Sequence, residues 1–84
     1  MPYIDSLVRQ RLDPDVEQLA SWIRNPGELN YAITKLCLEV LDEANYEHYN
    51  AMIGVLECAK LEMYRRAVGP YEDGKIAANG DVYG

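Results

Sequence analysis

The sequence lacks the residue combinations that most enzymes and metal sites require. Its only histidine is His48 and its only cysteines are Cys37 and Cys58, so no second His or Cys stands at ligand spacing from His48. The glycine motifs that bind phosphates or dinucleotides are absent, and His48 alone would have to serve any catalytic triad. We therefore predict a non-enzymatic protein with no catalytic residues, no metal site and no cofactor.

Long apolar runs are missing as well. No stretch approaches the roughly 20 apolar residues of a membrane-spanning helix, and no charged-then-apolar leader precedes Pro2. These absences predict a cytoplasmic protein without membrane association. In a reducing compartment, Cys37 and Cys58 are expected to be small buried hydrophobic residues rather than a disulfide pair.

Basic side chains are few. The chain has 8 Lys and Arg residues against 14 Asp and Glu residues, which gives a net charge of −6. This balance opposes binding to a nucleic-acid polymer, because the phosphate backbone requires a basic footprint. A small anionic ligand stays possible, since a local group of arginines can hold one phosphate.

The apolar residues that are present recur at helical spacing. Hydrophobic residues make up 49% of the 84 residues, which is enough for a packed core. We predict an all-α fold in a single small domain, residues 1–84. Its expected parts are two short helices in residues 1–25, an antiparallel helical hairpin in residues 27–68, and a C-terminal arm in residues 69–84.

Turn and capping residues set the expected boundaries. Asp13-Pro14 should separate the two N-terminal helices, because Asp is a good cap and Pro suits the first helical position. The third helix is expected over residues 27–44, with Glu28 in its first turn as a capping carboxylate. The fourth is expected from a break near Asn45 to Val68, where Gly69-Pro70 should stop it.

Both long helices carry a second apolar face. Ala51, Gly54, Cys58 and Leu61 lie opposite the main stripe of the fourth helix, and the small residues would let another helix approach closely. A helix that is apolar on two sides is normally buried on two sides, so we predict a homo-oligomer. The alternative is that the two N-terminal helices cover both faces.

The arm holds the candidate ligand-binding residues. A short helix is expected over residues 70–78, ended by Asn79-Gly80. Arginines suit anions, and tyrosine rings stack on bases, so their proximity is typical of a nucleotide site. The predicted ligand-binding residues are Tyr64, Arg65, Arg66, Tyr71, Lys75 and Tyr83.

Structural roles are the alternative for the same residues. Glu62 lies within reach of both arginines, so these side chains could form a solvated salt-bridge cluster. The tyrosines could anchor the arm, which has little apolar content, onto the helices.

Three segments carry a resemblance to a known family. They are MPYIDSLVRQRLDP at the start, GELNYAIT at residues 27–34 and YRRAVGPYEDGKIAANGDVY at residues 64–83. With these segments the chain resembles a family of short, uncharacterised proteins encoded in bacteriophage, prophage and metagenomic DNA. The resemblance implies a phage context, hence the host cell cytosol, and a small helical fold; it implies no catalytic residues.

Two functions from different classes follow as hypotheses. The first is a non-enzymatic phage accessory protein that binds a small anionic, nucleotide-like ligand at an oligomer interface and sequesters a host immune signal. The second is an acidic protein–protein inhibitor or adaptor that binds a basic host surface. A purely structural role in the virion is a third.

Overall fold

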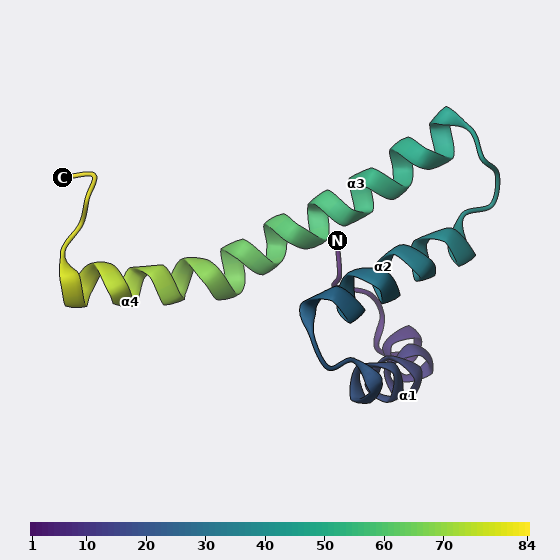
Figure 1. The fold of residues 1–84 in the computed structure, drawn as a ribbon, viewed down its shortest axis with the longest axis horizontal. Helices are drawn as coiled ribbons and strands as arrows, with labels where there is room; N and C mark the ends of the chain where they lie inside the picture. The colour runs from purple at the N-terminus through teal and green to yellow at the C-terminus, as the bar shows by residue number, and fades with distance from the viewer. The chain divides into compact units, whose positions relative to one another are not determined.

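The computed structural model describes residues 1–84 and consists of helices joined by turns. The helices are α1 (Ser6–Trp22), α2 (Pro26–Val40), α3 (Tyr46–Met63), the π-helical segment η1 (Tyr64–Val68) and α4 (Gly69–Asn79) (Figure 1). The predicted all-α class is confirmed. None of the helices combines the length and apolar character of a membrane span.

The residues group into two compact units. One comprises residues 2–52, and the other comprises residues 53–84 together with Met1. The prediction of a single domain over residues 1–84 stays a prediction. All six candidate ligand-binding residues belong to the second unit.

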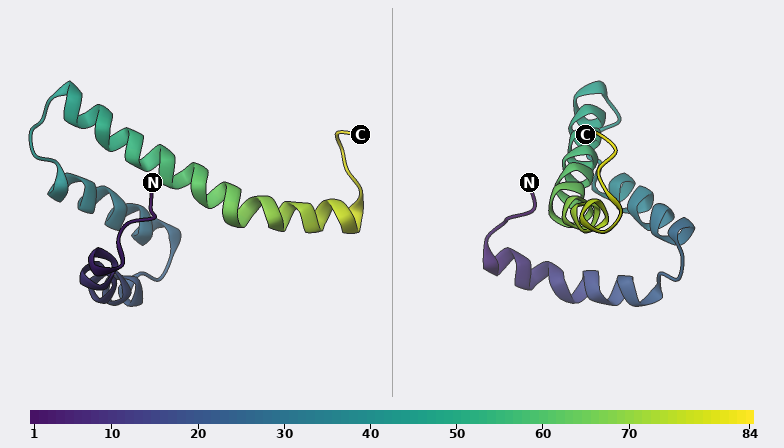
Figure 2. Two further views of the ribbon diagram at one scale, coloured as in Figure 1. Left: turned by 180° about the vertical axis from the view of Figure 1, so that it is seen from behind. Right: turned by 90° about the vertical axis from the view of Figure 1, so that its left-hand side faces the viewer.

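The N-terminal region forms one helix, so the prediction of two short helices was wrong. α1 runs through Pro14 without interruption (Figure 2). The Asp13 side chain, which would have to cap a second helix, caps none. Asp5 caps the single helix instead, because its Oδ1 accepts a hydrogen bond of 2.8 Å from the Leu7 N–H. Proline removes one backbone hydrogen bond, at a cost of about 3 kcal/mol, and here the helix tolerates that loss.

A reciprocal cap starts α2 and confirms the capping role of Glu28. The Asn25 Oδ1 accepts a hydrogen bond of 2.9 Å from the Glu28 N–H, and Glu28 Oε1 accepts one of 2.9 Å from the Arg24 N–H. Pro26 occupies the first turn, where its missing N–H is not needed. This arrangement resembles a capping box, with Asn in place of Ser or Thr and with the Glu28 carboxylate on the N–H of the residue before the cap.

The turn after α2 begins earlier than predicted. The helix ends at Val40 and not near Ala44. Residues 41–45 are held out of the helix by side chains: the Glu43 N–H donates to His48 Nδ1 at 3.1 Å, and Asn45 Oδ1 accepts from the His48 N–H at 2.9 Å. His48 therefore has a structural role at the start of α3.

The helix does not stop at Gly69-Pro70, so that prediction was also wrong. In η1 the hydrogen bonds reach one residue further back than in an α-helix, and the Gly69 N–H donates to the Tyr64 carbonyl. Pro70 then falls in the first turn of α4, which needs no donor at that position. α4 ends as predicted at Asn79-Gly80, with Gly80 at a φ of 93°.

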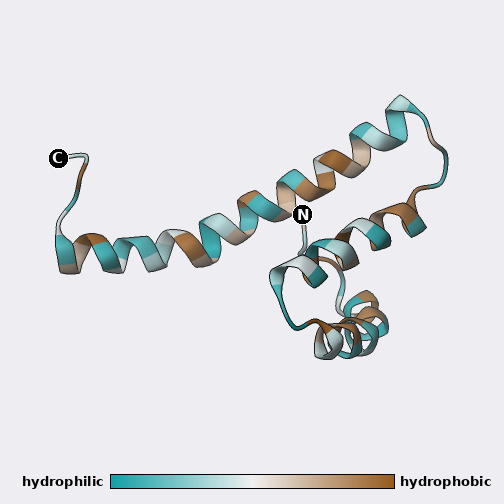
Figure 3. Cartoon of the chain, viewed as in Figure 1, coloured by the Kyte–Doolittle hydropathy of each residue, from teal (hydrophilic) through white to brown (hydrophobic).

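No residue of the chain is buried, so the expected core is not present in a single copy. Apolar and polar residues alternate along every helix (Figure 3), and the apolar ones stay exposed. Cys37 is half-buried and Cys58 is exposed, which corrects the expectation that both are buried.

Apolar side chains of α1 and α2 surround a common space. They line a hollow of about 190 Å³ within the unit of residues 2–52. Its walls are formed by Val16, Leu19 and Ala20 of α1, by Ile23 directly after α1, and by Leu29, Ala32, Ile33 and Leu36 of α2. We name this the α1–α2 hollow.

Candidate functional site

The six candidate residues follow one another along the second unit. Tyr64, Arg65 and Arg66 lie in η1. Tyr71 and Lys75 lie on α4, and Tyr83 lies in the segment that follows it. Arg66 and Lys75 are separated by nine residues, about 13 Å along the axis and between a third and half a turn around it, so their side chains point to different sides of the helix and do not converge on one phosphate.

The two arginines differ in their partners. Arg65 Nη2 forms an ion pair of 2.7 Å with Glu62 Oε1, one helical turn earlier. Arg66 forms no hydrogen bond or ion pair within the chain, and its side chain is exposed. Arg65 thus follows the structural alternative, while Arg66 offers an unused guanidinium to a ligand.

Tyr64 is linked to an acidic residue of α4. The Glu72 carboxylate accepts a hydrogen bond from the Tyr64 hydroxyl, and its negative charge also opposes loss of the Tyr64 proton; together they raise the pKa of Tyr64 above its ordinary value. The two residues are eight apart. One π turn and one α turn take about eight residues together, so η1 brings both side chains to the same side of the helix.

Tyr71 and Lys75 also meet. The Lys75 Nζ lies 5.6 Å from the centroid of the Tyr71 ring, one turn earlier on α4. At this distance the ammonium is attracted to the ring face. The pair presents a positive charge and an aromatic ring on one exposed patch, which is the combination predicted for a nucleotide ligand.

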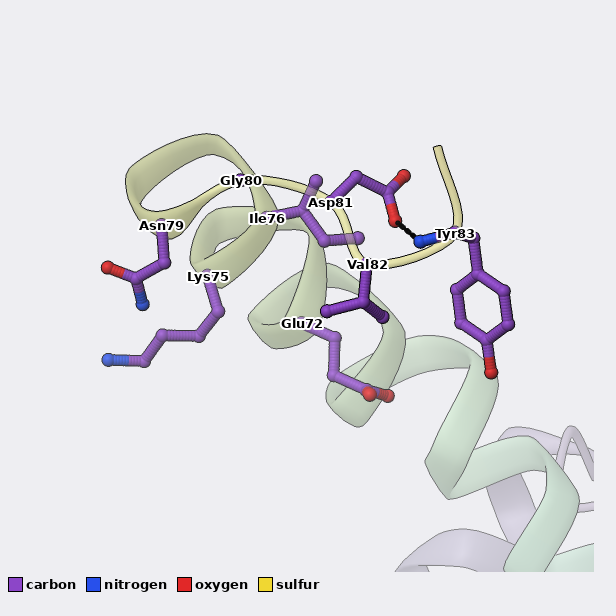
Figure 4. Close-up of a pocket in the computed structure, with 8 residues that line it drawn as sticks. All are labelled: Glu72, Lys75, Ile76, Asn79, Gly80, Asp81, Val82 and Tyr83. Atoms are coloured by element: carbon purple, nitrogen blue, oxygen red, sulfur yellow. Dashed lines mark hydrogen bonds between the residues drawn. The ribbon is translucent and has the colours of Figure 1, made fainter.

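A pocket of about 300 Å³ lies at the C-terminal end of α4, between the helix and the last residues of the chain (Figure 4). Ile76 and Val82 contribute its apolar wall, and Tyr83 lies at one side while Lys75 extends to the other. The backbone bends here because Asp81 Oδ1 accepts a hydrogen bond of 2.8 Å from the Tyr83 N–H.

The electrostatics of this pocket do not favour an anion. Glu72 and Asp81 line it, against Lys75 as the single cation. The C-terminal end of α4 adds a partial negative charge, because its last carbonyls are unpaired and point outward. An anionic ligand is therefore better placed near Arg66 than in this pocket.

The structure thus joins some candidate residues and separates others. It pairs Tyr71 with Lys75, and it turns Arg65 and Tyr64 toward carboxylates. Sequence reasoning missed Glu72, because the link to Tyr64 depends on a π turn that simple helical spacing does not reveal. No three His, Cys, Asp or Glu side chains converge anywhere in the chain.

Comparison with known proteins identifies a family. Residues 1–82 match the family model described as a domain of unknown function (DUF6899), and the chain belongs to this family. This match confirms the resemblance to an uncharacterised family, over nearly the whole chain. No curated protein and no solved structure matches the chain.

Proposed function

We propose that this protein is a non-enzymatic, self-associating helical protein that binds a small anionic, nucleotide-like ligand where two copies meet. Arg66 would hold the anion, and the Tyr71–Lys75 pair would stack on the base and add charge. The observation that carries the proposal is Arg66: it is exposed, and it has no partner of its own within an acidic chain.

A second copy is needed for geometric reasons. In one chain Arg66 and Lys75 point to different sides of the helix and lie about 13 Å apart along it, so they do not converge on one phosphate. A second copy supplies the missing charge when its α4 lies beside η1 of the first. The large exposed apolar surface supports self-association, because a stable protein rarely leaves so much of it in water.

The biological setting belongs to the same proposal. The similarity of the three sequence segments to phage and prophage proteins supports an accessory role during infection, in the host cytosol. Sequestering a host signal of nucleotide type would need only binding and no catalysis. The absence of a catalytic constellation in the sequence is compatible with this role.

Native mass spectrometry before and after denaturation tests the proposal. We expect subunit multiples that carry an added mass of a small ligand, released on unfolding. Titration calorimetry with ADP then measures affinity, with inorganic phosphate as the probe for the anion alone. Arg66→Gln should weaken ADP binding about 10- to 100-fold, since a charged hydrogen bond contributes about 1.5–3 kcal/mol.

Arg11→Gln on α1 is the matched control, because it removes the same charge from another exposed site and should leave binding unchanged. Equal weakening in both variants would mean that only net charge matters. Unchanged ADP binding in Arg66→Gln would refute the role of Arg66.

A specific observation favours the second candidate, an acidic inhibitor or adaptor. Residues 2–52 contain four basic and nine acidic side chains, which gives a net charge of −5. Asp42 and Glu43 lie in the exposed turn before α3. An inhibitor acting through this face should lose its partner in Asp42→Asn with Glu43→Gln and tolerate Arg66→Gln. The reverse pattern would exclude it.

A further inference from the structure

The end of α4 carries an asparagine followed by a glycine, Asn79-Gly80, and this pair occurs nowhere else in the chain. In such a pair the backbone nitrogen of the glycine can attack the side-chain carbonyl carbon of the asparagine, because glycine has no side chain that obstructs the approach. A new N–C bond closes a five-membered imide, the C–N bond of the carboxamide breaks, and ammonia leaves with the proton of the glycine N–H. Solvent water then opens the imide at either carbonyl carbon and leaves aspartate or isoaspartate.

The side chain of Asn79 is available for this reaction. Asn79 is the last residue of α4 and is exposed, and its carboxamide forms no hydrogen bond within the chain (Figure 4). Gly80 is also exposed, and the added Cβ of another residue would meet nothing there. No partner therefore has to be displaced from the carbon that is attacked.

One hydrogen bond restrains the attacking nitrogen. The Gly80 N–H donates to the Ile76 carbonyl at 2.8 Å. The nitrogen attacks only after it has released this proton, so the hydrogen bond must break first. Many helix ends are closed by a second backbone bond from the following residue, but here the Asp81 N–H donates to no backbone carbonyl.

Little of the second unit covers this last turn. Ala77 and Ala78 are exposed, and Val82 and Tyr83 in the segment that follows are 92% and 96% exposed. Because no packed side chains have to separate, the turn should open by local fraying at a free energy well below that of global unfolding.

We propose that Asn79 is a self-modification site, which the folded protein converts slowly to aspartate and isoaspartate with the Gly80–Ile76 hydrogen bond as the gate. Both products place a carboxylate beside Asp81 at the C-terminal end of α4, where unpaired carbonyls already carry partial negative charge. Isoaspartate also adds one carbon to the main chain, which changes the spacing that lets the Gly80 N–H reach Ile76. The modification is thus a one-way switch that opens the end of α4 and the pocket beside it. It depends neither on the proposed ligand nor on self-association.

Ageing of the whole chain at neutral pH in heavy-oxygen water tests the site. Samples are kept folded or unfolded in urea, and their peptides are mapped by mass with fragmentation that distinguishes isoaspartate from aspartate. Ala51→Gly is the matched control, because it places a glycine after Asn50 inside α3, where the following N–H is bonded within the helix. Both asparagines are then read in the same molecule, at the same global stability. Asn79→Gln is the chemical control, because its longer side chain would have to close a larger and less favoured ring.

We expect heavy oxygen at Asn79 in the folded protein and none in Asn79→Gln. The folded rate should be several-fold below the rate in urea and several-fold above that of Asn50 in Ala51→Gly. Ala78→Gly should raise the folded rate about two- to fivefold, because glycine weakens the last helical turn, and should leave the rate in urea unchanged. Ala77→Gly repeats this test within the same turn.

Three results would overturn the proposal. Absence of heavy oxygen at Asn79 in the folded protein would mean that the site does not react. Equal rates in the folded protein and in urea, or an unchanged folded rate in both glycine variants of the last turn, would mean that the hydrogen bond is no gate. Equal folded rates at Asn79 and Asn50 in Ala51→Gly would mean that the reaction requires global unfolding and not fraying of α4.

Discussion

Replacement of Gly54 by alanine distinguishes whether the helix surface around Gly54 faces water or packs against another helix. Glycine in a helix interior is less favourable than alanine by about 0.8–1.0 kcal/mol, because it loses more backbone entropy on folding. In a single copy, nothing lies within 4 Å of the added Cβ. If that surface stayed in water, Gly54→Ala would therefore stabilise the protein by about this amount.

Burial of the second apolar face, on which Gly54 lies, against another helix predicts a different result. A methyl group placed where two backbones approach closely overpacks the contact, at a cost of about 1–3 kcal/mol. The gain in helix propensity is then cancelled or reversed, and dimer affinity falls. Gly74→Ala is the internal control, because Gly74 is also helical, with nothing within 4 Å of an added Cβ, and lies outside the apolar face that contains Gly54.

Urea unfolding followed by circular dichroism at several protein concentrations measures both effects. Gly74→Ala should stabilise the protein by about 0.8–1.0 kcal/mol at every concentration. Gly54→Ala should show no such gain, and its transition should depend more strongly on concentration than that of the unsubstituted protein. Equal stabilisation by both substitutions, with unchanged self-association, would refute the reasoning.

Three further predictions concern local features. Asn25→Ala should destabilise the protein by about 1 kcal/mol in thermal unfolding, because the Glu28 N–H loses its cap, while Asn25→Asp should keep most of the stability. Glu72→Gln should lower the pKa of Tyr64 toward its ordinary value, measured by ultraviolet titration with Tyr64→Phe as the reference. Because the pKa of Tyr64 is raised in the folded protein, the stability that it contributes is present at neutral pH and is lost only as the pH rises through that pKa. Gly80→Ala should lower the free energy of unfolding by about 1–2 kcal/mol, because an L-residue is strained at a φ of 93°. A D-alanine introduced at this position by synthesis should recover that stability.

Local sequence signals predicted much of the secondary structure. Glu28 was predicted in the first turn of α2, and Asn25 and Pro26 supply the side-chain cap and the first-turn proline that complete this start. Asn79-Gly80 specifies the end of α4 for the opposite reason, since Gly80 adopts the positive φ that closes a helix. These signals act within a few residues, so no tertiary contact was needed to interpret them.

Pro14 and Pro70 led to wrong helix boundaries because the backbone around a proline can compensate for its energetic cost. Pro14 lies inside α1, whose apolar stripe from Leu12 to Ile23 keeps one phase on both sides of it. Pro70 follows a π turn that places it where no donor is needed. In both places the sequence shows the cost of the proline but not the backbone adjustment that accommodates it.

The candidate site was predicted as a set of residues but not as an arrangement. Regular helical spacing places residues 64 and 72 about 80° apart, whereas the π turn brings Tyr64 to Glu72. The ion pair of Arg65 with Glu62 followed from spacing alone, because the two are one turn apart. In the proposed function a second copy completes the surface around Arg66, and the sequence of one chain does not specify how two copies would meet.

Self-association through the exposed apolar faces is the central claim, and the mass of the protein in solution tests it most directly. Light scattering coupled to size exclusion should be run over a wide range of concentrations. The account predicts a discrete multiple of 9.6 kDa, with a dimer as the smallest species. A helical particle of 9.6 kDa at all concentrations would contradict it, because the exposed apolar faces would then have no second copy to cover them.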